Sequence, residues 1–353
     1  MAGTLLLDIG AGTLDVAWLD ETGEQLFQAV CPSPVRVVAG LVEKIAGPTV
    51  ISGREMGGGA LAAALAEKAK QQRLVITPAA AATISHQLEK VESLGLELAV
   101  EEKALGLAAE PGWGHLILGD VRLAQLQPLM ELLGARQPID IVGICLQDHG
   151  RPPAAESHLS FRSRWLTKLI SEANQWRELG FFSTEIPTWL GRMRSAAADA
   201  AELLPGKIFI MDSSLAAVCG AAAQAIAEGC HSVLAIDAAT SHTMAALFEE
   251  KRIVGYFELH TRDATSALID EFIDGLLSAS LHPQDVLDKG GHGGWCSGDK
   301  ISPQVFLAVG PRRKLLLDSR YSFRAGAPLG NNYLAGCAGL AAALGLATPF
   351  SRF

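Results

Sequence analysis

Residues 8–15 read Asp8-Ile9-Gly10-Ala11-Gly12-Thr13-Leu14-Asp15, and this stretch decides the fold. A short run of β-branched residues and leucines precedes it over residues 4–9, and an extended pattern resumes over residues 14–18. Two apolar runs joined by a short glycine-rich segment predict a pair of strands connected by a tight hairpin. The simplest interpretation of Gly10 and Gly12 is that they only make this turn.

A second copy of the pattern occurs later in the chain. Residues 233–236 form another apolar run that ends in Asp237, and the small-residue turn Ala238-Ala239-Thr240-Ser241 leads into a further extended run. The two copies lie too far apart for a solenoid repeat. They suit two similar lobes that face each other across a cleft, which we place at residues 1–210 and 211–353. We expect the final helix to pack back on the first lobe.

Two facing hairpins of small residues are suited to a phosphate chain. Backbone N–H groups in such turns approach phosphates without Cβ clashes, and the hydroxyls of Thr13 and Thr240 add donors. An aspartate at the end of the preceding strand can hold Mg²⁺, usually through water, because this ion keeps several of its waters. We therefore expect Asp8 and Asp237 to position Mg²⁺ at a phosphoryl-transfer site.

The composition limits the classes of function. The 353 residues are 49% hydrophobic, enough for a sizeable core in two domains. A formal charge of −9 argues against a nucleic-acid partner, because such a partner needs a basic face. With no charged leader and no apolar stretch of about 18 residues, we expect a cytoplasmic protein without a membrane partner. The six cysteines form no C-x-x-C or C-x-x-x-C-x-x-C group, so their local spacing supports neither a metal nor an iron–sulfur site.

The first hairpin resembles the first phosphate motif, D-x-G-x-G-T-x-D, of the superfamily of actin, heat-shock 70 chaperones, hexokinase and carbohydrate kinases. Asp8, Gly10, Gly12, Thr13 and Asp15 match this motif residue for residue. It is neither a P-loop nor a dinucleotide fingerprint, because it has no G-K-[ST] ending and leads into a strand. The resemblance implies an α/β fold with two ribonuclease-H-like lobes around a nucleotide cleft, the actin-like ATPase fold. It also implies ATP and Mg²⁺ as cofactors, with Ala11 in the phosphate loop.

The later part of the chain follows the order of the same superfamily. Asp237-Ala238-Ala239-Thr240 stands where a D-x-G-G-G-T type of motif is expected, but the glycines are missing. Residues 212–221 resemble the Ala-rich connecting helix before that motif, and residues 335–346 resemble the final connecting helix. Gly310, Pro311 and Arg312 resemble the turn that contacts adenosine. The resemblance thus covers most of the chain.

A narrower resemblance rests on residues 54–59, Arg-Glu-Met-Gly-Gly-Gly, and 146–150, Leu-Gln-Asp-His-Gly. These stretches look like a family of anaerobic bacteria and archaea that is often labelled "putative pyruvate formate-lyase activating enzyme". A radical activating enzyme would need a C-x-x-x-C-x-x-C cluster motif, which this chain lacks. We therefore do not expect radical chemistry.

Three further segments are candidates for the site. Asp148 follows a predicted buried strand, and either Asp148 or Glu185 would orient an attacking water or take a proton; a turn cap is the alternative for Asp148. Gly57 to Gly59 precede a predicted helix and either bind an anion or only allow a sharp turn. The glycine loop at residues 290–296 is either a lid over a ligand or a surface loop.

Four functions remain open from the sequence. The first is an ATPase whose lobes move with the nucleotide state and act on a partner protein. The second is a carbohydrate-type kinase, in which a small-molecule hydroxyl replaces water at Asp148. The third is a non-catalytic nucleotide-binding scaffold, which the missing glycines favour. The fourth is a reductive-activator ATPase, in which a homodimer would share an iron–sulfur cluster through cysteines such as Cys219 and Cys230.

Overall fold

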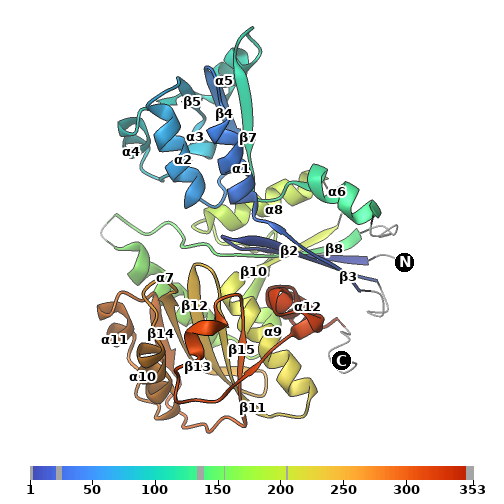
Figure 1. Ribbon diagram of the computed structural model, residues 1–353, viewed down its shortest axis with the longest axis vertical. Helices are drawn as coiled ribbons and strands as arrows, with labels where there is room; N and C mark the ends of the chain where they lie inside the picture. The colour runs from blue at the N-terminus through green and yellow to red at the C-terminus, as the bar shows by residue number, and fades with distance from the viewer. Residues whose placement is uncertain (1–2, 21–25, 133–138, 155, 204–205, 347–353) are drawn as a thin grey trace.

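The computed structural model describes residues 3–20, 26–132, 139–154, 156–203 and 206–346 (Figure 1). Within these residues the chain forms three β-sheets, two of six strands and one of four. None of the described helices combines the length and the apolar character that crossing a bilayer requires.

The first sheet carries the first hairpin. Its strands, in spatial order, are β3 (Leu26–Pro32), β2 (Thr13–Leu19), β1 (Gly3–Ile9), β8 (Ile139–Leu146), β10 (Lys207–Asp212) and β9 (Gly180–Phe182). The three N-terminal strands run antiparallel to one another, and β8 and β10 continue the sheet parallel to β1. β1 is buried along its whole length, as its leucine-rich sequence predicts.

The second sheet repeats this plan. Its order is β14 (Gly293–Cys296), β13 (Arg252–His260), β12 (His242–Glu249), β11 (Ser232–Ala238), β15 (Val305–Val309) and β16 (Phe323–Ala325). Again three antiparallel strands are followed by two that are parallel to the first. Two sheets with the same five-strand plan are two ribonuclease-H-like lobes, so the expected α/β fold is confirmed.

An inserted third sheet was not foreseen as a unit from the sequence. Its four parallel strands are β6 (Glu97–Leu98), β5 (Leu74–Ile76), β4 (Thr49–Gly53) and β7 (Gly114–Leu118). Together with its helices it forms the unit at the top of Figure 1, with a hydrophobic core of its own. The connections are α1 (Pro34–Glu43), α2 (Ala60–Ala69), α3 (Pro78–Ala81), α4 (Leu88–Ser93) and α5 (Glu101–Ala108).

The remaining helices cover the two large sheets. They are α6 (Leu123–Leu132), α7 (His158–Glu172), α8 (Gly191–Leu203), α9 (Ser213–Ala227), α10 (Ser266–Leu277), α11 (Pro283–Asp288) and α12 (Ala335–Ala343), with short 3₁₀ turns at 176–179, 313–316, 328–330 and 332–334. α7 packs on β13 and β14 of the second sheet, although it lies between two strands of the first sheet in the sequence.

Helices α9 and α12 pack against each other at the centre of the molecule (Figure 1). Their contact is made of alanine and glycine, and α12 also packs on β1 and β8. A Cβ atom at Gly339 would collide with the Ala216 carbonyl oxygen, and one at Gly220 would collide with that of Ala335. The small residues therefore let the two helix backbones approach closely.

Candidate functional site

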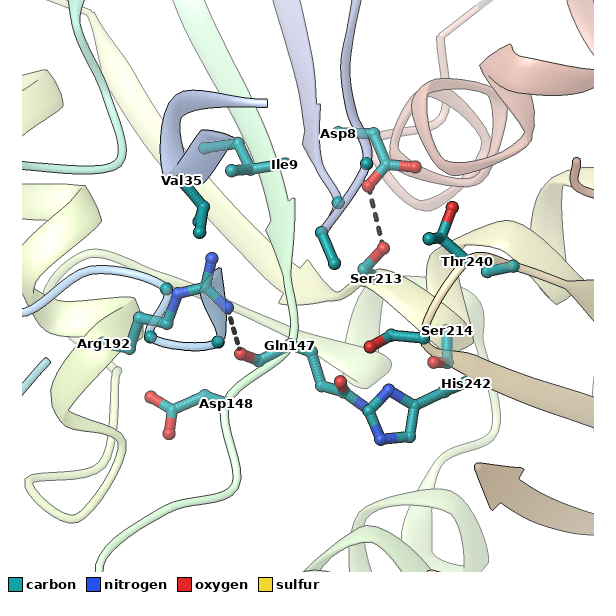
Figure 2. Close-up of a pocket in the computed structure, with 18 of the residues that line it drawn as sticks. Asp8, Ile9, Val35, Gln147, Asp148, Arg192, Ser213, Ser214, Thr240 and His242 are labelled. Atoms are coloured by element: carbon teal, nitrogen blue, oxygen red, sulfur yellow. Dashed lines mark hydrogen bonds between the residues drawn. The ribbon is translucent and has the colours of Figure 1, made fainter. Parts of the chain in front are cut away.

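A cleft with a volume of about 760 Å³ lies where the three sheets meet. Both hairpins line it, at residues 8–13 and 239–242, and so do the chain after β8 at residues 147–150 and the start of α9 (Figure 2). The inserted unit contributes residues 55–60 and 82–86. This volume is within the usual range of small-molecule sites.

The first hairpin is held in a defined shape. The Gly10 N–H donates to the Thr13 carbonyl oxygen at 3.0 Å, which closes the turn, and Asp8 pairs with Asp15 across the two strands. The Ser33 hydroxyl, at the start of α1, donates to the Gly10 carbonyl oxygen at 2.7 Å. The loop predicted from the sequence is thus a rigid hairpin at the wall of the cleft.

The second hairpin has the same turn without the glycines. The Ala239 N–H donates to the His242 carbonyl oxygen at 3.1 Å, the bond that matches Gly10 to Thr13. Thr240 occupies the place of Ala11, and His242 occupies the place of Thr13.

The tips of the two hairpins meet across the cleft. A Cβ atom at Gly12 would lie 2.9 Å from the Thr240 hydroxyl oxygen, so the absence of a side chain at Gly12 allows this approach. The backbone N–H groups at both tips therefore border one narrow space.

Three buried carboxyl groups lie at the roots of the hairpins. Burial raises the pKa of Asp8 to about 6, and the Ser213 hydroxyl, which donates to Asp8 at 2.8 Å, opposes this shift (Figure 2). Burial, with the charge of Asp8 nearby, raises the pKa of both Asp15 and Asp237 to about 8. Asp15 Oδ1 is buried without a hydrogen-bond partner among the described residues.

These carboxyl groups fit a divalent cation. Crowded acidic side chains without a counter-charge hold protons, and a hard cation such as Mg²⁺ would replace those protons. Among the described residues that line the cleft, none is a lysine and one, Arg192, is an arginine. Arg192 is already paired with Asp120, at 2.7 and 3.1 Å.

The predicted adenosine turn lies at one end of the cleft. Gly310 and Pro311 line it, beside Asn332 and Tyr333. Gly310 has a φ of +88°, and a Cβ atom there would collide with Asp237 and Ala238. Arg312 is exposed and does not line the cleft; its N–H donates to the Ala238 carbonyl oxygen at 2.8 Å.

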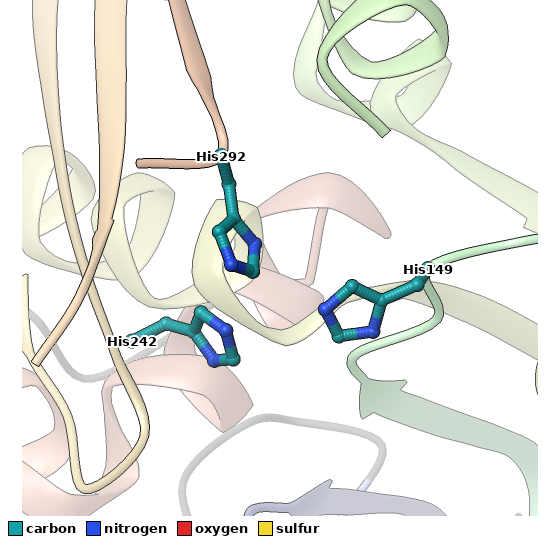
Figure 3. A group of neighbouring side chains, drawn as sticks. All are labelled: His149, His242 and His292. Atoms are coloured by element: carbon teal, nitrogen blue, oxygen red, sulfur yellow. The ribbon is translucent and has the colours of Figure 1, made fainter. Parts of the chain in front are cut away.

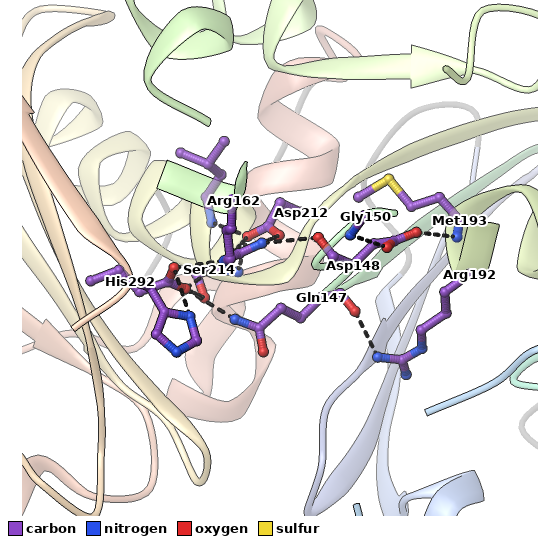
Figure 4. Close-up of polar contacts among 11 residues, drawn as sticks. Gln147, Asp148, Gly150, Arg162, Arg192, Met193, Asp212, Ser214 and His292 are labelled. Atoms are coloured by element: carbon purple, nitrogen blue, oxygen red, sulfur yellow. Dashed lines mark hydrogen bonds and ion pairs between the residues drawn. The ribbon is translucent and has the colours of Figure 1, made fainter. Parts of the chain in front are cut away.

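The chain after β8 is fixed by a buried polar network (Figure 4). Asp148 accepts from the Gly150 N–H at 2.8 Å through one carboxylate oxygen and from the Met193 N–H at 3.0 Å through the other. Burial raises the pKa of Asp148, against the effect of these two bonds. Asp148 therefore lines the cleft but holds the first turn of α8, which favours the capping interpretation over a role as base.

The second candidate base, Glu185, is not brought to the cleft. Its carboxylate accepts from the Phe182 N–H at 2.9 Å and pairs with Arg177 at 3.2 Å on an exposed surface. The prediction failed because the residue follows a short edge strand, β9, that the sequence did not reveal.

The glycine segments have steric roles. A Cβ atom at Gly58 would lie 2.6 Å from the Thr83 carbonyl oxygen, and one at Gly57 would lie 2.8 Å from Arg192 Nη2. The loop predicted as a lid instead contains the edge strand β14, which pairs with β13. The reductive-activator hypothesis loses its cysteine pair, because Cys219 is fully buried within α9 and cannot reach a subunit interface.

Sequence reasoning missed a group of histidines at the floor of the cleft. His149, His242 and His292 each offer one ring nitrogen, and these atoms all lie within 4.8 Å of one another. The three residues come from segments far apart in the chain, so no local spacing in the sequence indicates that they meet.

Two lobes of the same strand plan, with facing aspartate hairpins, define a protein of the actin-like ATPase fold. The chain belongs to the family described as "Putative pyruvate format-lyase activating enzyme (DUF1786)", whose model matches residues 56–315. The family description does not establish an activity for this chain. The sequence contains no C-x-x-x-C-x-x-C motif.

Several solved structures with weak similarity to this chain name a bound nucleotide in their titles. A ROK family glucokinase from Streptomyces griseus in complex with glucose and AMPPNP is 11% identical, with 97% of this chain and 99% of that chain covered and a TM-score of 0.35. ParM from Bacillus thuringiensis with ADP is 12% identical, with 97% and 98% covered and a TM-score of 0.28. The PilM–PilN type IV pilus biogenesis complex is 13% identical, with 99% of both chains covered and a TM-score of 0.38. Because these TM-scores are low, the fold is assigned from the sheet topology alone. Comparison with curated proteins finds no match.

Proposed function

We propose that this protein binds ATP with Mg²⁺ between its two lobes and hydrolyses it, and that the resulting lobe movement acts on a partner protein. The observation that carries the proposal is the pair of hairpins whose turns are closed by the same backbone hydrogen bond and whose tips meet beside three buried carboxyl groups. The backbone N–H groups at residues 11, 12, 240 and 241 would bind the phosphates. Gly310 and Pro311 would border the adenosine.

Mg²⁺ would be held by Asp8 and Asp237, with Asp15 beside them, and would neutralise phosphate charge. This cation is central to the proposal because the described cleft lacks a lysine and its one arginine is paired. Nucleotide binding should therefore depend strongly on the divalent cation. The lost glycines of the second hairpin do not argue against binding, since its turn matches that of the first.

The carbohydrate-type kinase remains the second candidate because the cleft extends into the inserted unit. Glu55 lines that extension and is hydrogen-bonded to His86 at 2.8 Å and to Arg151 at 2.9 Å. Burial favours the protonated Glu55, but the hydrogen bonds and charges of His86 and Arg151 outweigh it and lower the pKa. An ionised carboxylate there would suit a polar substrate.

The first test is calorimetric titration of ATP with and without Mg²⁺ into wild type and Asp8→Asn. We expect the variant to lose Mg²⁺-dependent binding and to remain folded, because asparagine can still accept from Ser213 but carries no charge. Asp199→Asn is the matched control, since Asp199 is a buried carboxyl outside the cleft with a pKa raised by burial to about 6. Equal ATP affinity in wild type and Asp8→Asn would refute the site.

A second test separates the candidate functions. Phosphate release from ATP and Mg²⁺ alone supports the ATPase, whereas turnover only with a sugar or polyol supports the kinase. ATP at 100 times its dissociation constant should stabilise the fold by about 2.7 kcal/mol, which a melting curve detects. If ATP does not shift the melting temperature, both the ATPase and the kinase hypotheses are wrong.

A further inference from the structure

The histidine cluster is formed by three segments that are distant in the sequence (Figure 3). His149 lies just after β8 of the first sheet, His242 begins β12, and His292 directly precedes β14 of the second sheet. The three rings face one another, with one nitrogen of each within 4.8 Å of the others. The cluster therefore joins the two lobes at the floor of the cleft.

Two of these rings are buried with unmet hydrogen-bonding capacity. His242 is 7% exposed and His292 is fully buried. His242 Nε2 and His292 Nδ1 have no hydrogen-bond partner among the described residues. Edge-to-face packing of the His242 and His292 rings, with centroids 4.5 Å apart, explains why the rings are close. It does not give these two nitrogens a hydrogen-bond partner. A buried polar atom without a partner costs free energy, so it suggests an unseen partner.

The surroundings keep the rings neutral, as metal ligands must be. Burial lowers the pKa of His149 well below its usual value and lowers those of His242 and His292 to about 3 and 4. The nearby carboxylate of Glu258 accepts from Arg162 at 2.7 and 2.8 Å, and Arg162 also pairs with Asp212 at 2.9 Å. Neutral imidazoles suit a transition metal better than Mg²⁺.

A second layer supports the cluster. Glu258 Oε2 lies 3.6 Å from His292 Nδ1, beyond hydrogen-bond distance, so this nitrogen stays available to a metal ion. His260, the register partner of His242, contacts His292 through their Nε2 atoms at 3.0 Å. His260 is therefore placed to orient His292 through Nε2, which leaves Nδ1 for the metal ion.

We propose that His149, His242 and His292 bind a divalent transition-metal ion of the zinc class that bridges the two lobes. His149 and His242 line the cleft, whereas His292 lies behind them, so the fourth coordination position faces the cleft and takes water or an oxygen of a bound ligand. This site is separate from the carboxyl groups proposed for Mg²⁺ and does not depend on nucleotide.

The geometry links metal binding to lobe position. Zinc–nitrogen bonds of about 2.1 Å place tetrahedral ligand nitrogens about 3.4 Å apart, closer than the 4.8 Å limit of this cluster. His149 moves with the first sheet, and the other two histidines move with the second. Metal binding would therefore bring the three ring nitrogens closer together, by ring rotation or by movement of the segments that carry them.

The test is zinc titration of the chelator-treated, tag-free protein, with Co²⁺ as an absorbing substitute. We expect one equivalent per chain, and a loss of affinity on the order of 100-fold or more in His149→Ala and His242→Ala. His231→Ala is the matched control, because His231 is an exposed histidine away from the cleft, and should bind like wild type.

Circular dichroism shows whether each variant is folded, and His149→Ala is the key variant because this ring is the least buried of the three. Asp8→Asn should bind zinc normally while losing Mg²⁺-dependent nucleotide binding, which distinguishes a failure of this site from a failure of the proposed function. Absence of zinc binding by wild type would overturn the proposal. So would an unchanged Co²⁺ spectrum in folded His149→Ala.

Discussion

At the scale of single residues, the site separates carboxylates that are free to bind a ligand from carboxylates that hold the backbone. Burial raises the pKa values of Asp8, Asp15 and Asp237, and the charge of Asp8 adds to the shifts of the other two. Asp148, in contrast, uses both oxygens on backbone N–H groups. Two acidic residues that look alike in sequence thus have different tasks because their hydrogen-bond partners differ.

Asp148→Asn tests this distinction. An amide can accept with only one of its two terminal atoms, so its NH₂ group would face a backbone donor. We expect a loss of about 1–3 kcal/mol in the free energy of unfolding with nucleotide affinity retained. Urea denaturation and ATP titration of the same preparation measure both quantities. Glu185→Gln serves as the control, with a nearly unchanged midpoint, because Glu185 is exposed. If Asp148→Asn keeps its stability but no longer hydrolyses ATP, the interpretation of Asp148 as a base would be correct.

At the scale of elements, the contact between α9 and α12 fixes the geometry of the phosphate end. α12 packs on β1, and a Cβ atom at Gly336, in its first turn, would collide with the Asp8 carboxylate. The Ala-rich sequence of both helices is thus a requirement of close backbone approach, not only of helix propensity.

Gly339→Ala should force these helices apart, because the added methyl group meets the Ala216 carbonyl oxygen. We expect a loss of about 1–3 kcal/mol in unfolding free energy and weaker nucleotide binding. Gly106→Ala is the matched control: Gly106 lies in exposed α5 with nothing near its Cβ position, so the change should stabilise by roughly 0.5–1 kcal/mol. Chemical denaturation compares the two, and equal effects would contradict the packing argument.

The sequence predicted the elements better than their assembly. The first hairpin was found because its glycines and aspartates are local, and the strand repeat at Asp237 located the second. The parallel sheet around β4 was not assembled, since a strand of two residues such as β6 carries little pattern. The histidine cluster was missed because its residues meet only when two lobes and the edge strand β14 are in place.

At the scale of the whole molecule, the buried carboxyl groups predict how stability depends on pH. Asp15 and Asp237 have pKa values of about 8 when folded, while in the unfolded chain they ionise near their usual pKa of about 4. Between these values the folded state holds protons that the unfolded state has released. Their contribution to stability therefore falls as pH rises from about 4 to about 8, and is fully lost above pH 8.

Thermal unfolding of the metal-free protein should thus show a Tm that falls from pH 6 to pH 8 and levels off above pH 8. Asp237→Asn should flatten this slope, because one of the titrating groups is removed. Mg²⁺ should raise the Tm most at pH 9, where the carboxylates are ionised and bind it without displacing protons. A Tm that is constant or rises over this range in wild type would show that the three carboxyl groups are not buried together as described.

The return of α12 to the first sheet has a consequence for how the protein is made. The Cys337 thiol contacts the Leu6 carbonyl oxygen at 3.7 Å, across 331 positions of the chain. While a ribosome is still translating the second lobe, β1 therefore waits with one face uncovered and its Asp8 open to water. The leucines of β1 are at risk of aggregation in that interval, because apolar surface that is exposed during folding tends to associate.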